Sequence, residues 1–189
     1  MNVAGKIEET KKNLAKTVFS MNMKMFLRDN LIHSDMHAGN ILFSTETAEL
    51  TILDAGQTAS LQPDVAPKFG KFLHAICTRN REEVFRSLLE FDENKGREIK
   101  DVDGFQEDVN EAMARFCADG DVIVVGDIMG QLFFALNKHK LTMRSDVSVT
   151  LMSMAVSEGL IRQLDPDFDM AASAMPYIAK YGTDYLRRA

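Results

Sequence analysis

The chain has 189 residues, of which 46% are hydrophobic and 26% charged, a composition typical of one soluble globular domain. Its formal net charge of −6 gives no basis for nucleic-acid binding, which needs a clustered basic surface. No uncharged apolar run reaches the roughly 18 residues that a membrane span requires, and no targeting signal is visible. Cys77 and Cys117 lack the CxxC spacing of metal or redox pairs, which favours reduced thiols in an intracellular protein.

The first predicted element is an amphipathic helix over residues 3 to 29, because its apolar residues recur at helical spacing. Residues 40 to 54 then contain two short β-prone runs, NILFS and LTILD, which are separated by the polar stretch TETAE. This pattern predicts a small β-hairpin.

From residue 64 to residue 187 the pattern is helical, which predicts a mainly α protein with one small β-hairpin, an α+β fold. Asp146 is the expected N-cap of one of these helices, and residues 92 to 104 are expected to form a solvated loop. The segments with three-to-four apolar spacing are residues 66–78, 80–91, 105–117, 126–139, 145–160 and 169–186.

The polar segment LIHSDMHAGNILF, residues 31 to 43, allows two chemical interpretations. In the first, His33, Asp35 and His37 alternate along an extended segment and share one face, where they bind zinc or iron. Asp127 or His139 would supply a further ligand. The corresponding function is a metal-dependent hydrolase, although no second cluster of histidine or cysteine residues supports it.

In the second interpretation the segment is the catalytic loop of a phosphotransferase. Protein kinases carry an aspartate base, an asparagine five residues later, and then an aspartate that opens a D-F-G turn. Here Asn40 follows Asp35 by five residues, and Asp54 ends the second β-prone run before Ala55 and Gly56. A hairpin returns the chain to its starting end, so Asp54 is expected beside Asn40.

Each residue type then has a chemical reason for its place. Asp35 can accept or orient the proton of an attacking hydroxyl group. Asn40 and Asp54 offer the hard oxygen ligands that Mg²⁺ prefers. Gly39 and Gly56 allow the backbone to bend tightly beside them. His33 is expected to brace the loop by hydrogen bonding.

Together, IHSDMHAGNILF and LTILDAGQ resemble the UbiB family of atypical kinases, which is related to the aminoglycoside and choline phosphotransferases. The family loop typically reads His-x-Asp-x-His-Pro-Gly-Asn, followed after a hairpin by Leu-Asp-Phe-Gly or Leu-Asp-Ala-Gly. Near the C-terminus, SEGLIRQLDPDFDM and MPY are similar to the family's later pattern. The resemblance spans residue 15 to the C-terminus.

The resemblance implies a kinase-like C-lobe over residues 1–189, with the catalytic loop and D-F-G-like turn at residues 31–57 and a helical remainder at 64–187. It implies Asp35 as the catalytic base, Asn40 and Asp54 as Mg²⁺ ligands, and His33, His37 and Gly39 as loop-shaping residues. The implied activity is phosphoryl transfer from ATP, linked to ubiquinone or other prenyl-quinone lipid metabolism. The implied locations are mitochondria, plastids or a membrane surface.

The sequence departs from the family pattern at three places. Ala38 replaces the proline before the glycine, and Ala55 replaces the phenylalanine of D-F-G. No glycine-rich nucleotide loop, V-A-I-K-like lysine or K-x-G-Q element precedes residue 33, so an N-lobe is missing from these residues. The alternatives are a fragment, a lobe completed by a partner chain, or a non-catalytic interaction module.

Overall fold

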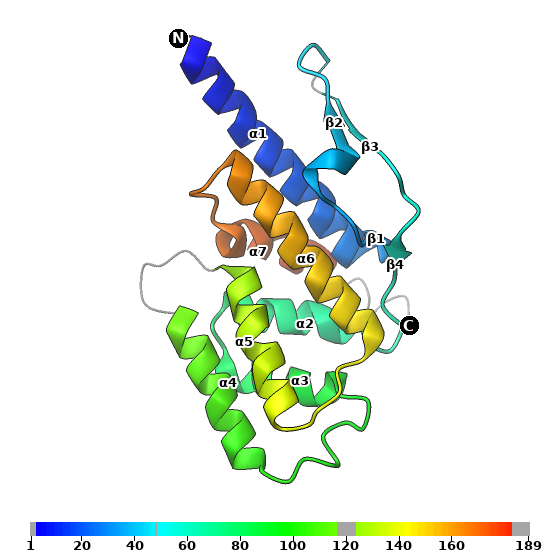
Figure 1. The fold of residues 1–189 in the computed structure, drawn as a ribbon, viewed down its shortest axis with the longest axis vertical. Helices are drawn as coiled ribbons and strands as arrows, with labels where there is room; N and C mark the ends of the chain where they lie inside the picture. Colours follow the sequence, from blue (N-terminus) through cyan, green and yellow to red (C-terminus); the bar gives the residue numbers. More distant parts are fainter. Residues whose placement is uncertain (1–2, 48, 117–123, 183–189) are drawn as a thin grey trace.

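The computed structural model describes residues 3–47, 49–116 and 124–182, and it is mostly helical with two small antiparallel sheets. This arrangement agrees with the expected α+β composition (Figure 1). The helices and strands in chain order are α1 (Val3–Lys24), a π-helix (Met25–Asp29), β1 (Ile32–His33), a 3-10 helix (Ala38–Asn40), β2 (Ile41–Phe43), β3 (Leu50–Ile52), β4 (Thr58–Ala59), α2 (Ala66–Cys77), α3 (Arg81–Phe91), α4 (Val102–Phe116), α5 (Val125–Lys138), α6 (Ser145–Leu164) and α7 (Met170–Tyr181).

The helix predicted over residues 3 to 29 is confirmed, but its last five residues form a π-helical turn. Asn30 ends this turn with a left-handed φ of 48°, and its backbone N–H donates to the carbonyl oxygen of Met25. Asparagine is one of the few residue types that adopt this conformation readily. The chain therefore leaves the helix sharply and enters β1 two residues later.

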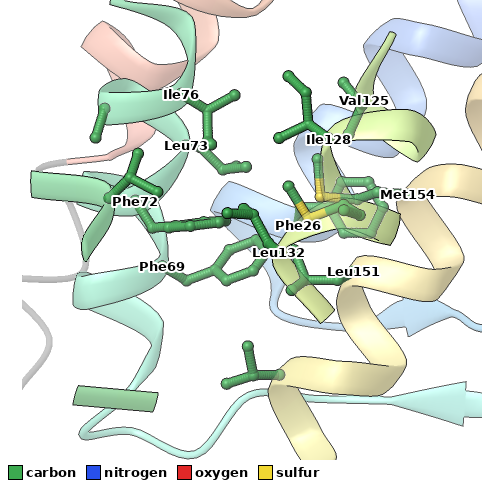
Figure 2. Packing of buried hydrophobic residues seen from close by; sticks show 14 of the residues in the cluster. Phe26, Phe69, Phe72, Leu73, Ile76, Val125, Ile128, Leu132, Leu151 and Met154 are labelled. Atoms are coloured by element: carbon green, nitrogen blue, oxygen red, sulfur yellow. The ribbon is translucent and has the colours of Figure 1, made fainter. Parts of the chain in front are cut away.

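A single hydrophobic core contains buried residues from each of the helices α1 to α7. In Figure 1, α6 crosses in front of α1, and these two helices pack against each other. Figure 2 shows Phe69 and Phe72 of α2 facing Leu132 and Leu151 in this core, and all four side chains are fully buried. Burying side chains of this size contributes roughly 1.5–3 kcal/mol each. The short strands are therefore attached to a well-packed helical body.

The predicted hairpin is confirmed, because β2 and β3 pair antiparallel with Ile41 opposite Ile52 and Phe43 opposite Leu50. The hairpin stands at the edge of the helical body in Figure 1. A second antiparallel pair was not predicted: β1 pairs with β4, with His33 opposite Thr58. Each of these strands has two residues, which is too short for an alternating pattern to be visible.

Helices α2 to α7 confirm the six helical segments expected after residue 64, but the expected N-cap at Asp146 is wrong. Helix α6 begins at Ser145, so Asp146 lies inside its first turn. The Asp146 carboxylate instead accepts hydrogen bonds from the Gln62 backbone N–H at 3.0 Å and from the Arg144 guanidinium at 3.2 Å. Arg144 occupies the N-cap position, and its side chain makes no capping hydrogen bond.

The expectation of a solvated loop at residues 92 to 104 is also partly wrong. Helix α4 already begins at Val102, and Asp92 is buried. The Asp92 carboxylate accepts from the backbone N–H groups of Asn94 and Gly96 and from that of Thr142 at 2.7 Å. One buried carboxylate thus ties this loop to the connection between α5 and α6.

None of the helices in the described ranges has the length and apolar character needed to cross a bilayer. Cys77 is a half-buried free thiol, and burial raises its pKa to about 11. Cys117 lies outside the described residues. His139 is held by Asp108, with 2.6 Å between Nε2 and Oδ2, so its role is structural.

Candidate active site

The polar segment starts from a backbone that is fixed to the core. Ile32 in β1 is fully buried, and the next residue, His33, is also buried. Just before β1, the side-chain amide of Asn30 donates to the Leu61 carbonyl oxygen at 2.8 Å and accepts from the Leu61 N–H at 2.9 Å. These two bonds join both ends of the segment that contains the candidate site.

His33 connects the two candidate aspartates. Its Nδ1 accepts a hydrogen bond from the Asp35 backbone N–H at 3.2 Å, so the ring proton resides on Nε2. Nε2 then donates to the backbone carbonyl oxygen of Asp54 at 3.0 Å. Because both ring nitrogens are occupied and the ring is buried, His33 has no lone pair to offer a metal ion.

Asp35 and Asn40 are joined directly. The Asn40 Nδ2 donates to the backbone carbonyl oxygen of Asp35 at 2.9 Å, and the His37 backbone N–H donates to the same oxygen at 3.0 Å. The bond through Nδ2 fixes which way the amide points and leaves Asn40 Oδ1 as an acceptor. The Asp35 carboxylate is about half exposed, at 47%.

His37 shapes the turn between these residues. Its Nδ1 accepts from the Gly39 N–H at 3.0 Å, and its Nε2 lies 3.6 Å from Asp35 Oδ2. A Cβ atom at position 39 would lie 2.8 Å from Cε1 of the His37 ring, which is why a glycine fits there. Met36, between the two polar residues, is buried and anchors the turn in the core.

Asp54 lies beside this turn at the end of β3. The Leu53 N–H donates to the Asn40 carbonyl oxygen at 2.8 Å, which extends the pairing of β2 and β3 by one step. Asp54 itself has a left-handed φ of 50°, and its Oδ1 accepts from the Gly56 N–H at 3.1 Å. A Cβ atom at position 56 would approach that same Oδ1 to 2.9 Å. The exposed carboxylate is therefore held by the turn that follows it.

The structure thus connects Asp35, Asn40 and Asp54 through one hydrogen-bonded segment, with His33 as a bridge. The geometry does not support the alternative zinc site. The chain turns after His33, so His33 and His37 do not share a face as alternating strand residues would. Within the described ranges, no group of three or more His, Cys, Asp or Glu side chains could hold a metal ion.

Sequence reasoning missed three residues that position this segment. Asn30 and Met36 are named above, and Ser34 donates through both its N–H and its hydroxyl to the Gln57 carbonyl oxygen at 3.0 Å. The burial of Met36 could have been predicted, because it is the one apolar residue between the polar Asp35 and His37. Asn30 and Ser34 had none, because their partners lie 31 and 23 residues away.

Comparisons with known proteins match the residues of this segment to a kinase-like domain. Residues 2–88 match the ABC1 atypical kinase-like domain, and residues 120–169 match the UbiB helical domain. A probable protein kinase UbiB of Pseudomonas putida is 25% identical over 177 residues, which cover 92% of this chain and 32% of that protein. An ABC1 family protein, mitochondrial, of Saccharomyces cerevisiae is 22% identical over 209 residues, with 85% and 32% covered.

An uncharacterised protein of Synechocystis is 23% identical over 171 residues, which cover 88% of this chain and 28% of that protein. The chain thus spans between 28% and 32% of the length of these three relatives. The ABC1 atypical kinase-like domain and the UbiB helical domain follow each other along the chain, and together they match most of the sequence. The chain belongs to the ABC1/UbiB family of atypical kinase-like proteins.

Proposed function

We propose that the chain forms the kinase-like C-lobe of a Mg-ATP-dependent phosphotransferase or ATPase, with its chemistry in residues 31–57. The observation that carries the proposal is the bond from Asn40 Nδ2 to the Asp35 carbonyl oxygen, together with the bridge through His33 to Asp54. These contacts tie Asp35 to Asn40 and, through His33, to the backbone of Asp54. They involve the same residues as the catalytic loop and D-F-G turn of kinases.

In this proposal Asp35 is the catalytic base. Its backbone is held by Asn40 and by the His37 N–H, whereas its carboxylate remains about half exposed. An exposed carboxylate on a fixed backbone can accept the proton of an incoming hydroxyl or water. His37 Nε2 lies 3.6 Å from Asp35 Oδ2, beyond hydrogen-bond distance, so it leaves that carboxylate available.

The remaining groups fit Mg²⁺. Asn40 keeps Oδ1 as an acceptor because Nδ2 is occupied, and Asp54 offers an exposed carboxylate, so both supply hard oxygen ligands. Bound Mg²⁺ would neutralise negative charge on the nucleotide phosphates. His33, Gly39 and Gly56 hold the backbone that carries these ligands, through the contacts described above.

A complete nucleotide site needs more than these residues. No glycine-rich loop or V-A-I-K-like lysine occurs before residue 33, and such groups clamp the phosphates in kinases. We propose that an N-lobe of the same polypeptide or of a partner chain supplies them. The same observation favours a second candidate, in which residues 1–189 serve as a non-catalytic interaction module.

The proposed biological role rests on the relatives described above. One is a probable UbiB protein kinase and another is mitochondrial, so we propose a role in ubiquinone or prenyl-quinone lipid metabolism in mitochondria, in plastids or at a membrane surface.

Paramagnetic NMR tests the metal site on residues 1–189 alone. Mn²⁺ replaces Mg²⁺ in oxygen-ligand sites and broadens the amide signals of nearby residues. We expect selective broadening around Asn40 and Asp54, loss of that broadening in Asp54→Asn, and retention in the exposed control Asp167→Asn. Broadening that ignores Asp54→Asn would exclude the proposed ligand.

A further inference from the structure

A cavity that is open to solvent lies away from the candidate active site, where the C-terminal half of α1 and the π-helix face α7. Its volume is about 510 Å³, within the range of about 300–1,000 Å³ that small-molecule sites occupy. None of its lining residues belongs to the segment 31–57. The lining residues are Lys16, Thr17, Ser20, Met21, Lys24, Met25, Arg28, Asp29 and Tyr177.

The lining carries more positive than negative charge, in a chain whose net charge is −6. Arg28 forms two hydrogen bonds with Asp29, at 2.7 and 2.8 Å, so these two charges are matched. Within the described part of the chain, Lys16 and Lys24 have no carboxylate within ion-pair distance. Lys24 is half-buried even so. Among the described residues, these two cations therefore face the cavity without a carboxylate at ion-pair distance.

The spacing lets both lysines reach one ligand. Lys16, Ser20 and Lys24 follow each other at intervals of four residues, so they lie on one face of α1. The lysine backbones are about 12 Å apart along the helix, and flexible four-carbon stems can bring both ammonium groups above Ser20. The hydroxyl groups of Ser20 and Tyr177 add hydrogen-bonding groups to the same wall, whereas the Thr17 hydroxyl already donates to the Asn13 carbonyl oxygen.

The π-helical turn that follows α1 borders the same cavity. Met25, Arg28 and Asp29 belong to the turn and also line the cavity. Turns of this kind are common where a helix ends, and this one ends at the left-handed Asn30. Here the turn places Arg28 and its partner Asp29 at the cavity.

We propose that this cavity binds a phosphorylated organic molecule. Two lysines and nearby hydroxyl groups suit the several oxygens of a phosphate group. The half-buried Met21, Met25 and Tyr177 provide apolar surface for the organic part, for which the volume leaves room. The phosphate can belong to a soluble ester or to a phospholipid headgroup at a bilayer surface.

The experiment is an NMR titration of residues 1–189 with sn-glycerol 3-phosphate, with glycerol as the uncharged control probe. The bilayer arm is co-sedimentation with phosphatidylcholine vesicles that contain or lack phosphatidic acid. Shifts are expected at the amides of residues 16 to 29 and at Tyr177. The double variant Lys16→Gln/Lys24→Gln should weaken binding at least about tenfold, because it removes two charge-assisted contacts.

The matched control is Lys11→Gln/Lys12→Gln, which removes two exposed lysines of the same helix outside the cavity. It should leave binding unchanged, and neither variant should change the unfolding midpoint. Binding in either arm that requires Lys16 and Lys24 supports the proposal and identifies the source of the phosphate. No binding in both arms, or equal losses in the two double variants, would overturn it.

Discussion

His33 is the residue on which the geometry of the candidate site most depends. Its ring joins the Asp35 N–H to the Asp54 carbonyl oxygen, although the two aspartates are 19 positions apart in the sequence. His33→Ala would leave both backbone groups without these partners in a partly buried place. We expect a loss of about 1–3 kcal/mol in the free energy of unfolding.

Urea unfolding measures this loss. The matched control is His74→Ala, because His74 is an exposed histidine on α2 and its removal should cost less than about 0.5 kcal/mol. Equal losses in the two variants would show that His33 does not hold the loop.

Gly39 and His37 should be coupled. In Gly39→Ala the new Cβ would lie 2.8 Å from the His37 ring, which is half exposed and can swing away. The cost should therefore stay below about 1 kcal/mol and consist mostly of the lost hydrogen bond to His37 Nδ1. A double-mutant cycle checks this, since Gly39→Ala should cost less in a His37→Ala background. Additive effects would contradict the assigned contact.

At the scale of elements, Asp146 links the start of α6 to the segment after β4. Burial disfavours its charged form, but hydrogen bonds from the Gln62 N–H and from Arg144 outweigh burial and lower its pKa. A lowered folded-state pKa stabilises the fold above the unfolded value of about 3.9, and this stability is lost as the pH falls through the lowered pKa.

Asp146→Asn should therefore reduce stability at neutral pH by about 1–2 kcal/mol and flatten the loss of stability below pH about 4. Thermal unfolding across the acid range measures both effects. If the variant keeps the wild-type acid dependence, Asp146 does not contribute to it.

Glu158 performs a related task at the start of α5. Its buried carboxylate accepts from the N–H groups of Val125 and Gly126, at 2.9 and 2.6 Å, and from Arg162. Glu158→Ala should cost about 3–5 kcal/mol, because it leaves buried donors unpaired, and Glu158→Gln should cost less. Chemical denaturation of both variants provides the test, and a loss in Glu158→Ala no larger than that in Glu158→Gln would contradict the role of the side-chain oxygens as hydrogen-bond acceptors.

The elements themselves were largely predictable. Apolar periodicity indicated the first helix, the hairpin and the six later helices, because each pattern is contained within one element. The pairing of β1 with β4, the burial of Asp92 and the true position of Asp146 were not predictable. Each depends on contacts between residues far apart in the sequence, such as Asp92 with Thr142, which lie 50 positions apart.

At the scale of the whole molecule, the candidate site was predictable to the extent that it is a motif. The spacing of Asp35, Asn40 and Asp54, with glycines beside the last two, identified the segment without structural information. The support from Asn30 was not visible, because its partner Leu61 lies 31 residues away. We propose that the phosphate-clamping groups belong to an N-lobe that residues 1–189 do not contain. These residues alone should therefore bind ATP weakly, because half a cleft supplies too few contacts to offset the entropy of fixing the nucleotide.

The most direct test of the proposed function is calorimetry of ATP binding as a function of Mg²⁺ concentration. It uses residues 1–189 joined to the N-lobe of a family relative, compared with Asp54→Asn and Asp35→Asn of the same protein. We expect Mg²⁺-dependent binding, loss of most of that dependence in Asp54→Asn, and wild-type binding in Asp35→Asn, since Asp35 acts on the acceptor hydroxyl and not on the metal. Mg²⁺-dependent binding that survives Asp54→Asn unchanged would contradict the account.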